Sequence, residues 1–315
     1  MNSDFRRPII RIAVLLGAWC CGFLFCVFVG KSVGTSWAEC GMGHTLADFW
    51  RGCSLSLQER LQGMDMDKDV MGQVLALTLG NREYLSPEIK ALYREAGAAH
   101  ILALSGMHLG ILYGFMRMIV RRLSYTKWRW LTLVVVLFVI WSYALLTGLP
   151  LSLVRAALMM SLALVLQMCW EGRKSIDILN VSVALVLLTD PASVMDVGFQ
   201  MSCAAMLGII VWGIPICEHW ARLPYICNLT ASSLTISISA QLGVLPLTLF
   251  YFESVACYGA ITSLMAIPLT TLIIYFSLGI YAGFGWCIPV VERLVGCQNM
   301  IMEFISTLPG AYIAF

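Results

Sequence analysis

The chain alternates long apolar segments with short polar turns, and this pattern leaves few folds open. The apolar segments cover about 9–30, 98–120, 130–147, 149–170, 175–189, 197–217, 231–252, 256–285 and 288–308. A helix of about 20 apolar residues crosses a bilayer. In lipid, backbone polar groups must be satisfied within the segment or a closed barrel, which excludes open strands. We therefore predict an all-α fold, a polytopic transmembrane helical bundle of about eight or nine spans.

Composition agrees with a membrane protein. Hydrophobic residues make up 60% of the chain and charged residues 12%, against about 45–50% and 25% in soluble domains. The net charge of +2 gives no sign of a nucleic-acid partner. Most of the twelve cysteines lie inside apolar segments, and no CxxC spacing occurs, so zinc-ribbon and thioredoxin-type sites have no support. Cys40 and Cys53 lie in a polar stretch and could pair if it is extracytoplasmic.

The order of polar and apolar segments divides the chain into three parts. Residues 1–30 form an N-terminal transmembrane helix, because the apolar run is longer than the roughly 7–15 residues of a signal-peptide core. Residues 31–97 form a hydrophilic extracytoplasmic loop with short helices near 67–79 and 86–97. Residues 98–315 form the main transmembrane domain. Within it, 256–285 is either one helix kinked at Pro268 or a re-entrant piece followed by a helix.

Basic residues in short loops give an orientation. Cytoplasmic loops of membrane proteins are rich in Lys and Arg. With the N-terminus in the cytoplasm, the basic loop 117–129, the pair Arg173 and Lys174, and Arg222 all fall on the cytoplasmic side. Asp190 and Asp196 then lie outside. We therefore expect a multi-pass protein of the bacterial inner (plasma) membrane with a cytoplasmic N-terminus.

Several polar side chains lie inside or next to the apolar segments, where they are costly. They are candidates for a hydrated cavity, but each also has a structural explanation. Ser and Gly pack helices closely, a lone His or Gln hydrogen-bonds a neighbour, Arg155 could reach the outer interface, and Asp196 could cap a helix. The candidates are Ser105, Gly106, His108, Arg155, Asp196, Gln200 and Gln241.

Enzyme motifs are not found in the sequence. There is no HExxH, no GxSxG and no P-loop, and Ser105 with His108 lacks a third orienting group. Cys40, His44 and Cys53 have no recognised metal-ligand spacing. We expect no enzymatic activity, no catalytic residue, no bound metal and no cofactor.

Four segments resemble the signatures of ComEC-type competence proteins. They are GAAHILALSGMHLG at 97–110, DPASVMDVGFQMS at 190–202, AQLGVLP at 240–246 and YGAITSLMAIP at 258–268. Arg155 and Ala156 fall where that family has an Arg-Ala pair in a helix. The order and spacing are similar over roughly 70–310. The family's C-terminal metallo-β-lactamase-like domain is not expected here, and the 31–97 loop looks too short for its OB-like domain.

The resemblance implies a channel that imports single-stranded DNA across the inner membrane in natural transformation. Its path would be lined by Ser105, Gly106, His108, Arg155, Asp196, Gln200 and Gln241. The partners would be single-stranded DNA, membrane lipid, a separate hydrolase or nuclease, a DNA receptor and a cytoplasmic helicase-type motor. Two other classes stay open. One is a small-molecule or ion transporter, and the other is a non-conducting remnant or scaffold subunit.

Overall fold

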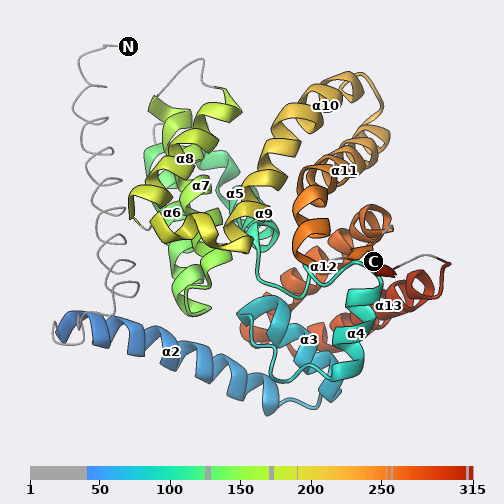
Figure 1. Ribbon diagram of the computed structural model, residues 1–315. Helices are drawn as coiled ribbons and strands as arrows, with labels where there is room; N and C mark the ends of the chain where they lie inside the picture. Colours follow the sequence, from blue (N-terminus) through green and yellow to red (C-terminus); the bar gives the residue numbers. More distant parts are fainter. Residues whose placement is uncertain are drawn as a thin grey trace. The chain divides into compact units, whose positions relative to one another are not determined.

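The protein is described by a computed structural model that covers residues 41–124, 129–169, 174–189, 191–252, 254–256, 258–309 and 312–314 (Figure 1). Helices form nearly all of these ranges. Two compact units are present: one combines residues up to Gly52 with Leu112–Asp196, and the other combines Cys53–Ile111 with Val197–Phe315. Helix α2 (Gly41–Gln62) and helix α5 (Gly106–Ser124) each contribute to both units.

The first unit is an array of consecutive helices. It contains α6 (Arg129–Leu146), α7 (Leu151–Cys169), α8 (Ser175–Thr189) and the short 3-10 helix η2 (Pro191–Met195). The turn between α6 and α7 has Gly148 and Leu149 both at positive φ. The Trp141 Nε1–H donates to Ser161 Oγ at 3.2 Å and joins the two helices. Neighbours in sequence are therefore neighbours in space within this unit.

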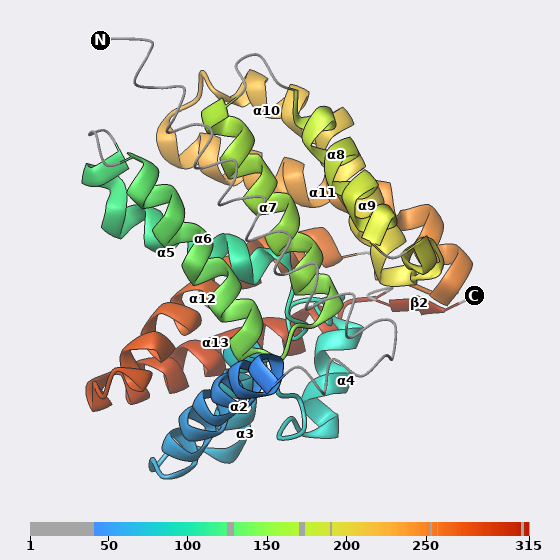
Figure 2. The same ribbon diagram turned by 90° about the vertical axis from the view of Figure 1, so that its left-hand side faces the viewer.

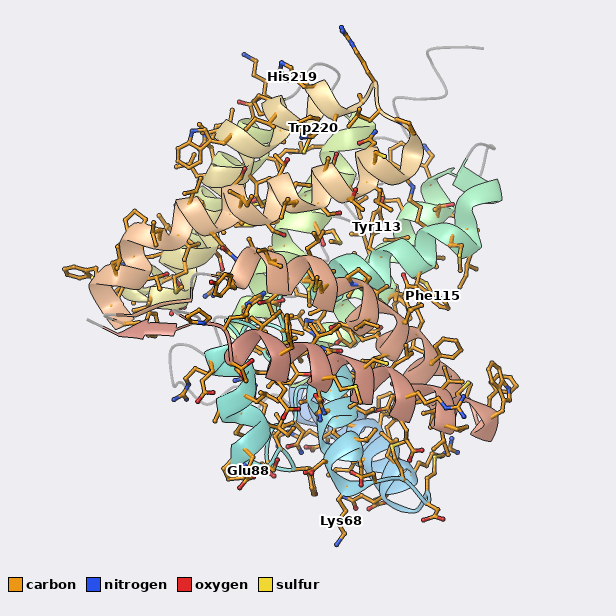
Figure 3. The ribbon with its side chains drawn as sticks, turned by 90° about the vertical axis from the view of Figure 1, so that its right-hand side faces the viewer. Lys68, Glu88, Tyr113, Phe115, His219 and Trp220 are labelled. Carbon is orange, nitrogen blue, oxygen red and sulfur yellow. The ribbon has the colours of Figure 1, made fainter. Side chains whose placement is uncertain are left out.

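In the second unit, one pair of helical arms forms an antiparallel hairpin. The first arm is α9 (Val197–Gly208), the π-helical segment η3 (Ile209–Gly213) and α10 (Ile214–Trp220); the second is α11 (Tyr225–Phe252). The arms approach closely where Gly208 and Gly243 meet, because a side chain on either would collide with the other arm's backbone. Small residues at such a crossing are typical of helix packing in membranes. Figure 3 labels His219 and Trp220 on α10.

The rest of the second unit contains its best-buried part, which we call the buried core. It consists of α3 (Lys68–Leu79), α4 (Pro87–Glu95), α12 (Gly259–Tyr281) and α13 (Ile288–Ser306). Figure 2 shows α12 and α13 running side by side, and η4 (Gly285–Cys287) lies between them in the chain. Eight consecutive residues of α3, from Gly72 to Leu79, are buried. Helices α3 and α4 begin at side-chain caps, Asp67 and Ser86.

Polar side chains join the helices of the buried core. The Tyr93 hydroxyl lies 3.2 Å from both Gln73 Oε1 and Asn299 Oδ1. The Thr78 and Tyr281 hydroxyls are 2.7 Å apart. Burial raises the pKa of the Tyr93 hydroxyl well above its usual value, because the charged phenolate is disfavoured away from water. The hydrophilic segment after Cys53 is thus not a free loop but is tied to the C-terminal helices.

The sequence predictions agree with much of this architecture. The helices near 67–79 and 86–97 are present as α3 and α4, and 256–285 holds a single helix that continues through Pro268. Three described helical segments are long and apolar enough to cross a membrane: Val197–Trp220, Cys227–Phe252 and Gly259–Tyr281. The predicted 9–30 helix, Cys40 and Asp190 lie outside the described residues.

Several features differ from the predictions. Helix α2 lies in the segment 31–97, where the sequence predicted a loop with helices only near 67–79 and 86–97. The run at 98–120 is not one helix, because α5 begins only at Gly106. The 288–308 segment is helical, but α13 is not among the three candidate spans; it carries Glu292, Arg293 and Glu303. A short antiparallel ribbon pairs β1 (Ser254–Ala256) with β2 (Tyr312–Ala314), where the sequence predicted only helices.

Candidate functional site

The seven residues predicted from the sequence fall into both units. Arg155 and Asp196 belong to the first unit, and the other five belong to the second: Ser105, Gly106, His108, Gln200 and Gln241.

His108 lies near the start of α5 and is 2% exposed. Its Nδ1 accepts the backbone N–H of Ser105 at 3.3 Å and lies 3.4 Å from the Ser105 hydroxyl. Because Nδ1 is an acceptor, the neutral ring carries its proton on Nε2. That Nε2 has no hydrogen-bond partner among the described residues. His108 thus presents a neutral, buried donor. Its Nδ1 lone pair, already used by a backbone N–H, is not free to activate the Ser105 hydroxyl.

The non-helical segment before α5 is held by the first turn of α12. Gly97 adopts a φ of 73°, in the left-handed region where glycine is favoured. The Thr262 hydroxyl donates to the Ala96 carbonyl at 2.8 Å. The Ser263 hydroxyl lies 3.4 Å from His100 Nε2. These contacts fix the segment that leads to Ser105, Gly106 and His108, with Gly106 as the first residue of α5.

Gln241 reaches the same place from α11. A methyl group added to Gly259 would lie 3.0 Å from Gln241 Nε2 and 3.6 Å from the Gly97 carbonyl. Three segments singled out in the sequence therefore meet at the start of α12. We call this meeting point the α12 site and define it as Gly97, His100, Gln241, Gly259 and Ser263.

Gln200 has a different environment. Its Oε1 accepts the Tyr251 hydroxyl at 2.9 Å, which joins α9 to the end of α11. The expectation that this glutamine needs a polar partner is confirmed. The contact places Gln200 at the hairpin and gives it a structural role there.

In the first unit, Arg155 and Asp196 form an ion pair. Arg155 NH1 lies 2.6 Å from Asp196 Oδ2, and the two side chains are 8% and 37% exposed. Arg155 is therefore buried against Asp196, and its place in a channel path stays a prediction. The opposite charges balance, so this pair presents little net positive charge to an anion.

The chemistry that these residues offer is hydrogen bonding by neutral groups. Hydroxyl, amide and imidazole groups surround the α12 site, and they bind water or polar ligands without a fixed charge. Within the described ranges, no three His, Cys, Asp or Glu side chains gather in a way that would hold a metal ion.

Sequence reasoning missed some residues of this site. Thr262 and Ser263 are 0% and 4% exposed and fix the loop, and Tyr251 is the partner of Gln200. The segment 258–268 resembles a family signature, but none of its residues is among the seven predicted from the sequence. Two adjacent hydroxyl side chains in an apolar run are the signal that would have found Thr262 and Ser263.

Comparison with known proteins gives a consistent result. The family described as "Competence protein" matches residues 77–314. "ComE operon protein 3" of Bacillus subtilis is 31% identical over 207 residues, which cover 65% of this chain and 25% of that protein. "Recombination protein 2" of Haemophilus influenzae is 24% identical over 215 residues, 65% of this chain and 27% of that protein.

A third relative has no assigned role in its name. "Uncharacterized protein YcaI" of Escherichia coli is 26% identical over 225 residues, 69% of this chain and 29% of that protein. The chain thus spans less than a third of the length of the curated relatives that it matches. No solved structure matches it.

Proposed function

The chain belongs to the competence protein family, and from this premise we propose that it acts in DNA uptake during natural transformation, as the membrane channel for one DNA strand. The observation that supports this most is the α12 site with its neighbour His108. Neutral hydrogen-bonding groups from α5, α11 and α12 are brought together between apolar helices. A polynucleotide cannot cross hydrocarbon, so its path has to be hydrated and polar.

Neutral hydrogen-bond donors are better suited to letting a DNA strand pass than to binding it tightly. A path lined with many cations would hold the phosphate backbone firmly, because release of counterions dominates affinity for nucleic acid. A channel needs sites that are favourable enough to enter and weak enough to leave. His108 Nε2 and the Gln241 amide offer such contacts. Ser105, Gly106 and Gln200 would shape the path rather than bind.

Arg155 would contact phosphate only by leaving Asp196. A charge swap tests this role. The double variant Arg155→Asp with Asp196→Arg keeps an ion pair but moves the positive charge from position 155 to position 196. If Arg155 and Asp196 serve only the fold, the swap restores the uptake lost in Arg155→Ala. If the guanidinium contacts the strand, uptake stays low while the amount of protein in the membrane recovers.

We further propose that the chain crosses the inner membrane eight or nine times. The N-terminal segment 9–30, the shorter apolar helices α5 to α8 and the three candidate spans give eight. Helix α13 would be the ninth. With the N-terminus in the cytoplasm, the basic loops after α5 and α7 lie inside. Reporter fusions after Ser124 and after Cys169 test this orientation.

The channel would need partners. A receptor would deliver DNA from outside, a separate hydrolase or nuclease would remove the second strand, and a helicase-type motor would pull the strand into the cytoplasm. Membrane lipid would cover the apolar side chains that α11 and α9 expose.

The central experiment compares two histidines. His108→Ala removes the buried donor, whereas His219→Ala changes an exposed histidine on α10 whose ring contacts the Pro215 carbonyl. We expect uptake of labelled DNA by competent cells to fall at least about tenfold in the first variant, a change of about 1.4 kcal/mol in barrier height. The second variant should behave as wild type. Equal uptake in both, at equal protein levels, would remove His108 from the path.

The transporter alternative makes a different prediction. Purified protein in liposomes would then accumulate a small solute or ion, and deletion in the cell would leave DNA uptake intact. A scaffold subunit would show neither solute accumulation nor a specific effect of His108→Ala. The two assays together separate the three classes.

A further inference from the structure

Helix α11 carries hydrogen-bonding side chains on two opposite faces. Successive residues of an α-helix are about 100° apart, so positions separated by two residues point about 200° apart. Ser237 and Ser239 therefore lie on opposite sides of α11. By the same spacing, Ser232, Thr235 and Gly243 share the face of Ser239, whereas Ser233 and Gln241 share the face of Ser237.

The structure explains the face of Ser239. Thr235 accepts the Trp220 Nε1–H at 3.0 Å, and the Ser232 carbonyl lies 3.7 Å from Cys217 Sγ. Ser239 is 2% exposed and packs against Gly213. This face is thus used to hold the hairpin together.

The face of Ser237 has no such explanation. Other hydroxyls in the apolar helices donate to the carbonyl four residues back, including those of Ser202, Thr248 and Ser263. In the described part of the chain, the side chains of Ser233, Ser237 and Gln241 form no hydrogen bond with another residue. All three are half-buried. Polar groups that stay unpaired away from water are costly, so their presence in a span points to water or a polar ligand beside them.

The flanks of α11 between the two faces are apolar. Ile236, Ile238 and Leu242 are 42%, 41% and 50% exposed. Such side chains suit contact with lipid, and they separate the two polar faces from each other. The face of Ser237 ends at Gln241, which contacts Gly259 in the α12 site. His108, whose Nε2 has no hydrogen-bond partner in the part of the chain that the structure describes, follows the segment that the α12 site fixes.

We propose that Ser233, Ser237 and Gln241 form one wall of the hydrated path, which leads along α11 to the α12 site. This inference rests on the proposed channel function and adds a lining helix to it. The ligand chemistry is that of neutral hydrogen-bonding groups, which suits water and the sugar, phosphate and base oxygens of a passing strand.

Substituted cysteines test the wall without DNA. Full-length protein in membrane vesicles is treated with a methanethiosulfonate reagent that carries a fixed positive charge and reacts with thiolates in water. We compare Ser237→Cys on the proposed wall with Ser239→Cys on the packed face and Ile238→Cys on the apolar flank. Labelling at each position is followed by mass spectrometry of the peptide, so native cysteines need not be removed. Serine and cysteine are close in size, which preserves the fold.

We expect Ser237→Cys to react at least about ten times faster than Ser239→Cys and Ile238→Cys, because burial away from water suppresses the thiolate. Ser233→Cys should react as fast as Ser237→Cys and serves as a second test. The inference is overturned if both wall positions react as slowly as Ile238→Cys.

Failure of the proposed function would look different. If the wall positions label quickly but prior labelling leaves DNA uptake unchanged, the hydrated wall is supported and the proposed DNA path is wrong. If labelling is fast and also blocks DNA uptake, while the reagent does not affect uptake by wild type, both the hydrated wall and the DNA path are supported.

Discussion

The hairpin of α9 to α11 and the buried core of α3, α4, α12 and α13 belong to the same unit but are stabilised in opposite ways. In the hairpin, Leu207, Val211 and Trp212 are 47%, 50% and 47% exposed. In the core, Val74, Leu75 and Ala76 are fully buried. The hairpin keeps many of its apolar side chains outside and brings the backbones of its arms close together at Gly208 and Gly243, whereas the core joins its helices through side chains. Apolar sequence therefore means lipid contact in one region and internal packing in the other.

The largest expected effect is a difference in stability between a core variant and a hairpin variant, and the comparison is wrong if this difference is not found. Leu75→Ala removes a fully buried side chain from the core and should lower the free energy of unfolding by about 3 kcal/mol. Leu242→Ala removes the same atoms from the hairpin, where half of the side chain is exposed, and should change it by less than about 0.5 kcal/mol in detergent. Denaturant titration of both variants measures this. Similar losses would mean that the hairpin is packed like the core.

The second effect concerns the backbone contact of the hairpin. Gly208→Ala places a methyl group against the Ser239 carbonyl, and we expect a loss of about 2 kcal/mol because the arms must move apart. Gly110→Ala is the matched control, since no described residue has an atom within 4 Å of its added carbon. Alanine favours a helix over glycine, so this control should be neutral or stabilising. A harmless Gly208→Ala would show that the arms do not touch there.

The third effect sharpens the description of the core. Tyr93→Phe removes the hydroxyl that contacts Gln73 and Asn299 and should cost about 1 kcal/mol at neutral pH. Because burial raises the pKa of Tyr93, folding favours the neutral phenol, and its contribution is intact below the unfolded value of about pH 10. The contribution is lost as the pH rises above that value.

The difference between wild type and Tyr93→Phe should therefore narrow above about pH 10. Unfolding titrations at pH 7, 9 and 11 measure the narrowing. A difference that stays constant or widens up to pH 11 would contradict a buried, neutral hydroxyl.

The smallest effect returns to the hairpin. The Trp220 Nε1–H donates to the Thr235 hydroxyl at 3.0 Å between the two arms. Side-chain hydrogen bonds between membrane helices contribute about 0.6 kcal/mol on average. A double-mutant cycle with Trp220→Phe and Thr235→Val should give a coupling near this value. Coupling above about 2 kcal/mol would mean that side chains, not glycines, hold the hairpin.

Local patterns allowed much of the fold to be predicted from the sequence. The helices near 67–79 and 86–97 begin after Asp67 and after Ser86, and such starts depend only on neighbouring residues. Hydropathy also located the three candidate spans. It also indicated a helix at 288–308, but not that one face of α13 is buried in the core while Glu292, Arg293 and Glu303 lie elsewhere on the helix.

The site was harder to predict because its contacts are distant in sequence. His108 and Ser105 are three residues apart, and their shared environment could be inferred from a single helical turn. Nothing local shows that Ser263 meets His100 across 163 positions, or that Asp196 pairs with Arg155. Residue type indicated which side chains needed partners, and only the tertiary structure shows which partners they have.

The burial of α3 has a consequence for the synthesis of the protein. Thr78 of α3 contacts Tyr281, which lies 203 positions later in the chain. Ribosomes add about 5–20 residues per second, so α3 emerges roughly 10–40 s before its covering helices exist. For that interval an apolar segment too short to anchor in the bilayer has no permanent cover. Nascent chains of this protein should therefore depend on a chaperone, or on transient shelter at the insertion machinery, more than their finished stability suggests.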